Sequence, residues 1–106
     1  MSDHISHDDL VALLTSIFRR HGCSNQVAQL LAENMATAER DGAESHGLFR
    51  MRGNLASLDS GWVDGSAEWV IEDVAPGILR ADGRNGFTLP VLAEAREPLM
   101  AKARQN

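Results

Sequence analysis

The first apolar pattern along the chain has the three- and four-residue spacing of one face of an amphipathic helix. Its members are Leu10, Leu13, Leu14, Ile17 and Phe18. Ser6 precedes this pattern, where an N-cap is expected, and His21-Gly22 follows it with the residue type that commonly ends a helix. These signals predict a first helix over about residues 6–21.

A second apolar stripe with helical spacing follows almost at once. It consists of Val27, Leu30, Leu31, Met35 and Ala38. Ser24 is its expected N-cap and Gly42 its expected end. Because the connection between the two stripes is only about three residues long, we expect the two helices to pack as an antiparallel pair.

The third helical pattern has two faces. We expect Ser45 to cap a helix that runs to about Leu58, and one side of it is apolar: Leu48, Met51, Leu55 and Leu58. His46, Arg50 and Asn54 are spaced four residues apart and fall together on another side. Glycine inside a helix costs roughly 1 kcal/mol relative to alanine, so Gly47 and Gly53 suggest that backbone approaches a neighbour closely there.

The pattern then changes from helix to strand. Residues 69–74 and 78–82 read as two strands joined by a turn at Pro76-Gly77, which predicts a hairpin. Residues 83–86 form a further turn, and Thr88 is the expected cap of a last helix reaching Ala103. Pro98 lies inside that helix and is expected to kink or split it. Trp62 and Trp69, which flank the turn before the first strand, are expected to be core or interface anchors.

Together these elements predict a mainly helical α+β fold: three N-terminal helices, a β-hairpin and a C-terminal helix. We divide the chain into a helical segment, residues 1–66, and a hairpin-plus-helix segment, residues 67–106. A two-stranded hairpin is not stable alone, so it must lie on the helices or pair with strands from elsewhere. With only two candidate strands before the last helix, we expect a fragment of a larger fold, truncated before its sheet.

Composition narrows the partner classes. The net charge of −5 and the scattered Lys and Arg residues argue against nucleic acid and against an anionic membrane surface as partners. Cys23 is the single cysteine, which excludes an internal disulfide and fits a reducing compartment; we expect Cys23 to be half-buried between helices. No apolar run approaches the ~20 residues of a membrane span, and no signal peptide is visible. We therefore expect a cytoplasmic protein.

His46 and Arg50 are the most suggestive chemical pair. A histidine with a pKa near 6.5 can give or take a proton at working pH, and an arginine one helical turn further can hold a carboxylate through two parallel hydrogen bonds. The positive end of the helix dipole would favour neutral His46 and a nearby anion. The pair therefore suits a small acid with a reacting group next to its carboxylate. Ser45 either orients the imidazole or only caps the helix.

A plainer interpretation is favoured on spacing alone. In it, Ser45 caps the helix, His46 is a surface residue and Arg50 pairs with Glu44 or Asp41. No glycine-rich nucleotide loop, paired-cysteine motif or zinc-protease motif is present. The other three histidines, His4, His7 and His21, have no metal-ligand spacing.

Three stretches carry a resemblance to a known family. They are Ala38-Glu39-Arg40-Asp41-Gly42, Ser45-His46-Gly47-Leu48-Phe49-Arg50 and Ser57-Leu58-Asp59-Ser60-Gly61-Trp62-Val63-Asp64-Gly65. They resemble the type 2 malate/L-lactate dehydrogenase family, and residues 45–65 most resemble its Δ1-piperideine-2-carboxylate/Δ1-pyrroline-2-carboxylate reductase branch. Residues 82–87 also resemble the family. The resemblance implies the N-terminal segment of a larger α/β, non-Rossmann, NAD(P)-dependent reductase, whose nucleotide-binding domain lies beyond this chain.

The same resemblance implies roles for site residues. His46 matches the family's proton donor, Ser45 its assisting neighbour and Arg50 the residue that binds the substrate carboxylate. NADPH or NADH would supply hydride to a small cyclic imino acid or 2-oxo acid. Asn54 stands where an aromatic residue is common, and its place beside His46 and Arg50 makes it a substrate-binding candidate. Arg52 also departs from the family, which often has proline there.

The resemblance further implies partners. Family members are homodimers, so we expect a homodimer or association with the missing C-terminal part, and little activity from this chain alone. The alternative is a non-enzymatic truncated helical module that oligomerises or binds a partner chain through the hairpin edge. No cofactor-binding residue is assigned within the chain, and no metal is expected.

Overall fold

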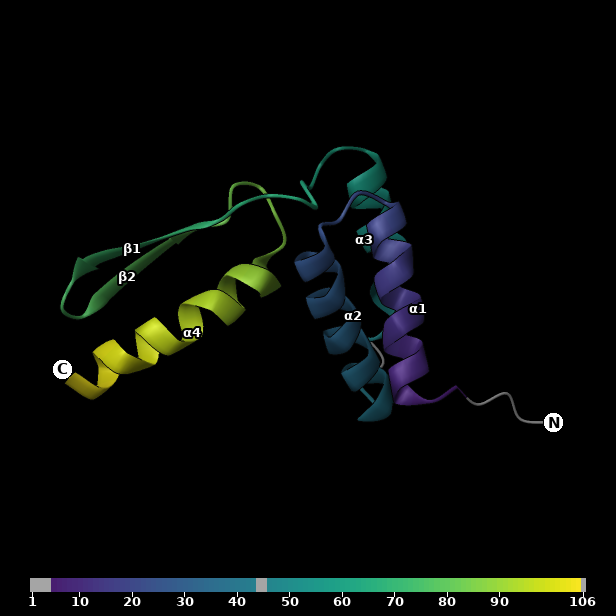
Figure 1. Ribbon diagram of the computed structural model, residues 1–106, viewed down its shortest axis with the longest axis horizontal. Helices are drawn as coiled ribbons and strands as arrows, with labels where there is room; N and C mark the ends of the chain where they lie inside the picture. The colour runs from purple at the N-terminus through teal and green to yellow at the C-terminus, as the bar shows by residue number, and fades with distance from the viewer. Residues whose placement is uncertain (1–4, 44–45, 106) are drawn as a thin grey trace.

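The computed structural model describes residues 5–43 and 46–105, and their elements occur in the predicted order (Figure 1). The elements are α1 (His7–Arg20), α2 (Asn25–Arg40), the short 3-10 helix η2 (Leu48–Arg50), α3 (Met51–Asp59), β1 (Val70–Ala75), β2 (Ile78–Asp82) and α4 (Thr88–Gln105). Figure 1 shows α1, α2 and α3 grouped on one side, with the hairpin and α4 extending to the other. The predicted mainly helical α+β fold is confirmed.

The first two helices form the predicted antiparallel pair (Figure 1). The Ser6 Oγ accepts a hydrogen bond from the Asp9 N–H at 3.1 Å, and the Ser24 Oγ accepts one from the Val27 N–H at 3.3 Å. Both side chains therefore satisfy backbone donors that have no partner within the helix. Between the helices, Gly22 adopts a φ of +99°, a left-handed conformation that glycine reaches without steric cost.

The hydrophobic core lies along the seam between α1 and α2, and Leu58 of α3 closes it. Its other buried members are Leu14, Phe18, Cys23, Val27, Ala28, Leu31, Ala32, Met35 and Ala36. Two residues assigned to apolar stripes are instead exposed: Leu13 by 51% and Leu48 by 42%. Both side chains lie outside the buried cluster between α1 and α2.

The predicted hairpin is confirmed, and α4 lies beside it (Figure 1). The strands pair antiparallel, with Val70 opposite Asp82 and a register shift between Asp73 and Ala75. The Lys102 ammonium group of α4 contacts the Asp73 carboxylate and donates to the Ala75 carbonyl at 2.7 Å. This lysine therefore joins the end of α4 to the end of β1.

Pro98 does not split α4, which continues through it. A proline within a helix frees the carbonyl four residues earlier, here that of Glu94. Both residues lie on exposed positions of α4, where water can hydrogen-bond the freed carbonyl. Within residues 5–43 and 46–105, none of the helices combines the length and the apolar character needed to cross a bilayer.

The loop after α3 ties the two groups of elements together. The Gly65 carbonyl accepts from the Ser24 N–H at 3.0 Å, and the Asn85 carbonyl accepts from the Asp64 N–H at 2.9 Å. The Asn85 side chain also donates to the Trp62 carbonyl at 3.0 Å. The predicted turn at residues 83–86 is thus an anchor for this loop. Trp62 itself is 78% exposed and is not a core anchor.

Gly65 and Gly53 offer a matched test of close packing. A Cβ added at Gly65 would lie 2.8 Å from the Leu58 Cδ2 and 3.0 Å from the Cys23 Cα, whereas one at Gly53 would meet nothing within 4 Å. Gly65→Ala should therefore lower the free energy of unfolding by about 1–3 kcal/mol through overpacking. Gly53→Ala should raise it by about 0.5–1 kcal/mol through helix propensity. Urea unfolding followed by circular dichroism measures both values, and equal effects would contradict this packing.

Candidate active site

The third helical segment begins later than the sequence predicts. Gly47 occupies the N-cap position of η2, with φ −95° and ψ −138°, and makes no side-chain cap. Ser45, the predicted cap, lies outside the described residues. His46 therefore precedes the helix instead of lying in its first turn, and its backbone N–H donates to the Ala43 carbonyl at 2.9 Å. The predicted uninterrupted helix through His46 is therefore wrong, because Gly47 separates His46, itself in 3-10 conformation, from η2.

His46, Arg50 and Asn54 nevertheless line the same pocket. The pocket has a volume of about 560 Å³ and lies between α2 and the segment that follows it. The remaining lining residues are Leu31, Asn34, Met35, Thr37 and Ala38 of α2, together with Ala43. His46 and Arg50 are exposed and Asn54 is half-buried. The predicted grouping of these three side chains on one side is therefore present, although the helix begins later.

The pocket combines an apolar wall with a few polar groups, as small-molecule sites do. Leu31 and Met35 belong to the core and also face the pocket, while Asn34 and Thr37 add polar groups from the same helix. Opposite them stand an imidazole and a guanidinium. One can exchange a proton, and the other presents a planar set of donors suited to a carboxylate.

The plainer interpretation of Arg50 named two carboxylates as its partners. Asp41 lies 3.2 Å from its neighbour Arg40, measured from the Arg40 Nε to the Asp41 Oδ1. Glu44, the other candidate, lies outside the described residues. Arg50 lines the pocket together with His46.

Comparison with known proteins places the chain in a family. Residues 5–106 match the malate/L-lactate dehydrogenase family. The chain belongs to this family. Its sequence is 57% identical over 96 residues to the Δ1-pyrroline-2-carboxylate/Δ1-piperideine-2-carboxylate reductase of Pseudomonas putida, a match that covers 91% of this chain and 28% of that protein. It is also 34% identical over 105 residues to a (2R)-3-sulfolactate dehydrogenase (NADP(+)) of Chromohalobacter salexigens, covering 99% of this chain and 31% of that protein.

Solved structures agree with this placement. The crystal structure of Δ1-piperideine-2-carboxylate reductase from Pseudomonas syringae pv. tomato superposes with a TM-score of 0.94 at 52% identity, over 98% of this chain and 31% of that one. The malate dehydrogenase of Pyrococcus horikoshii shares the fold, with a TM-score of 0.85 at 22% identity over 98% of this chain and 30% of that one. This family member therefore spans less than a third of the length of the relatives it matches.

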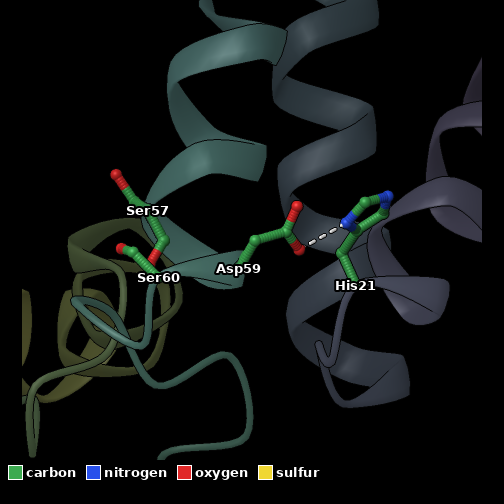
Figure 2. A network of polar contacts seen from close by, with 4 residues as sticks. All are labelled: His21, Ser57, Asp59 and Ser60. Atoms are coloured by element: carbon green, nitrogen blue, oxygen red, sulfur yellow. Dashed lines mark hydrogen bonds and ion pairs between the residues drawn. The ribbon is translucent and has the colours of Figure 1, made fainter.

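Outside the candidate site, His21 of this dehydrogenase-family chain makes a contact between two helices. The His21 Nδ1 lies 2.7 Å from the Asp59 Oδ1 and joins the ends of α1 and α3 (Figure 2). Figure 2 shows Ser57 and Ser60 on the other side of Asp59 from His21, and the Ser60 hydroxyl donates to the Ser57 carbonyl. No hydroxyl of these two serines is thus aligned for His21 to activate. His4 lies outside the described residues.

Metal ligation finds no support in the described part of the chain. No group of three or more His, Cys, Asp or Glu residues there could hold a metal ion. His7 and Asp8 of α1 line a small surface pocket together with Glu33 of α2. Those three side chains are therefore surface polar groups between α1 and α2.

Cys23 is more deeply buried than the sequence suggested, with 7% exposure against the turn of Gly65. Burial in this apolar setting raises the pKa of the Cys23 thiol from 9.0 to about 11. A thiol nucleophile needs the opposite shift, because only the thiolate attacks. Cys23 therefore belongs to the core.

The raised pKa of Cys23 predicts slow thiol chemistry. At pH 8 the buried thiol should hold about 100-fold less thiolate than an unfolded chain with the ordinary pKa, so a disulfide reagent should react at least that much more slowly. Its rate should rise about tenfold per pH unit up to pH 11. The contribution of this group to stability is fully present below pH 9, and it is lost as pH rises from 9 toward 11. The chain in denaturant is the control, and equal rates would contradict burial.

Proposed function

We propose that this chain supplies the proton donor and the carboxylate-binding group of an NAD(P)H-dependent reductase acting on a small cyclic imino acid or 2-oxo acid. The observation that carries the proposal is the convergence of His46, Arg50 and Asn54 on one pocket. Membership of the malate/L-lactate dehydrogenase family and 57% identity to an imino-acid reductase support the reaction class.

Each side chain has a role in this proposal. Arg50 holds the substrate carboxylate through parallel N–H bonds, which fixes the neighbouring C=N or C=O group beside His46. Protonated His46 donates its proton to that nitrogen or oxygen as charge develops there. Ser45 assists the imidazole, and the Asn54 amide hydrogen-bonds the substrate ring or carboxylate. When bound, the reduced nicotinamide supplies hydride to the carbon of the same double bond.

The size of the pocket fits this assignment. Its volume of about 560 Å³ falls within the ~300–1,000 Å³ of small-molecule sites and leaves room for a planar ring beside a small acid. We propose that most of the cofactor site lies outside this chain, because the relatives are over three times as long. A cytoplasmic location and NADPH or NADH as the hydride donor belong to the same proposal.

The direct test is a chimeric enzyme in which this chain replaces the matching segment of the Pseudomonas syringae reductase, which is 54% identical over 100 residues. NADPH oxidation with Δ1-piperideine-2-carboxylate should be restored. His46→Ala should lower kcat by about 100-fold or more, because it removes a general acid. His7→Ala is the matched control, since His7 lies at the start of α1 and is not among the residues that line the pocket.

Two results would reject the assignment. One is turnover in the His46→Ala chimera equal to that of the His7→Ala chimera. The other is a well-folded chimera that binds NADPH and reduces neither a cyclic imino acid nor a 2-oxo acid.

A second candidate function rests on the apolar face of α4. Leu92, Leu99 and Met100 are 60%, 49% and 42% exposed, and they line an apolar groove of about 400 Å³. Exposed apolar patches of this kind mark association surfaces. We propose that α4 carries contacts between chains, as in a homodimer or an assembly with a C-terminal part. The non-enzymatic alternative would instead use the edge of the hairpin.

Adding negative charge to the α4 groove tests whether chains associate through it. The 106-residue chain should self-associate, and the double variant Leu92→Glu/Leu99→Glu should shift it toward monomer in light scattering. Gln105→Glu adds the same kind of charge on α4 outside the groove and should leave the mass unchanged. A wild-type chain that stays monomeric at all concentrations would rule out self-association through α4.

A further inference from the structure

We infer that Glu39 is a positioning residue of the candidate site: its carboxylate anchors the backbone between His46 and Arg50 to α2. The Glu39 Oε1 accepts a hydrogen bond from the Leu48 N–H at 2.7 Å. Glu39 lies in the last turn of α2, while Leu48 begins η2. The contact therefore joins the two walls of the pocket. A role for this contact in catalysis rests on the proposed function.

The contact replaces a missing cap. The first N–H groups of a helix have no partner within it, and Gly47 at the N-cap position has no side chain to offer one. A carboxylate suits this position because its charge complements the positive end of the helix dipole and strengthens the hydrogen bond. Here the carboxylate comes from another helix, nine residues earlier in the chain. The start of the third helical segment is thus set by α2.

Gly47 shows how closely the two segments approach. A Cβ at this position would lie 2.4 Å from the Glu39 Oε1 and 2.8 Å from the Glu39 Cδ and Cγ. Gly47 is buried although its neighbours His46 and Leu48 are exposed. Any side chain at position 47 would therefore displace the Glu39 carboxylate. The absence of a side chain at Gly47 is what allows the hydrogen bond to form.

The anchored peptide lies directly between the two proposed functional groups. His46 precedes Gly47, and the Arg50 N–H donates to the Gly47 carbonyl at 3.0 Å. Ala38, which neighbours Glu39 on α2, lines the pocket, whereas Glu39 itself is absent from the lining. Glu39 thus holds the backbone that carries His46 and Arg50 without facing the pocket. Loss of this contact would free that backbone to move away from α2.

Four variants of the chimeric enzyme test this role. Glu39→Ala should lower kcat/KM by about tenfold to 100-fold, mainly by raising KM, because Arg50 loses its position. Glu39→Gln keeps an acceptor oxygen and should recover most of the activity. Gly47→Ala should resemble Glu39→Ala. The double variant Glu39→Ala/Gly47→Ala should be no worse than Glu39→Ala, because the added methyl group then has room.

Glu33→Ala is the matched control. Glu33 is an exposed glutamate on α2, bonded at its carboxylate to the Gln29 side chain within the same helix. This variant should leave kcat and KM unchanged. Thermal unfolding of every variant separates a loss of positioning from a loss of fold, since Glu39→Gln and Glu39→Ala should differ in KM by far more than in the fraction folded at assay temperature.

A readout independent of turnover uses the 106-residue chain itself. The imidazole NMR signals of His46 should shift in Glu39→Ala, while those of His7 stay in place. Unchanged His46 signals together with unchanged KM would overturn the inference, as would equal losses in Glu39→Gln and Glu39→Ala. An inactive wild-type chimera would reject the proposed function alone, because the NMR comparison would still decide whether Glu39 positions His46.

Discussion

The buried seam between α1 and α2 is the interaction on which the rest of the molecule depends. Phe18 is fully buried in it, and Leu31 and Met35 face the same core from α2. Leu31 and Met35 also line the pocket, so one helix serves as a wall of the core and a wall of the candidate site. Any shift of α2 along the seam would therefore move the core residues and the α2 side of the pocket together. The position of the α2 wall of the site is therefore set by the helix pair.

The second group of elements is attached to this pair through polar backbone contacts and glycine packing. Gly65 presses against Leu58 and Cys23, and its carbonyl accepts from the Ser24 N–H at the start of α2. Asn85 continues the connection toward the hairpin and α4. A hairpin of two strands gains little stability from its own hydrogen bonds. Its position follows from these loop contacts and from Lys102 on α4.

Local signals in the sequence predicted most of the fold. Ser6, Ser24 and Gly22 mark the ends of α1 and the start of α2 because capping and left-handed backbone depend on residues close in sequence. The hairpin followed from alternating apolar residues around a proline–glycine turn. What spacing could not give was the start of the third helical segment. That boundary depends on Glu39, whose link to Leu48 crosses between elements.

The candidate site shows the same division between local and distant causes. The four-residue spacing of His46, Arg50 and Asn54 correctly grouped them, but the opposite wall of Asn34 and Thr37 depends on how α2 packs. Gly47 was the one sequence signal of that packing, although a glycine there costs less than one inside a helix, and Gly53 marked no close approach. A glycine near a chemical pair gains meaning only when a second segment is found against it.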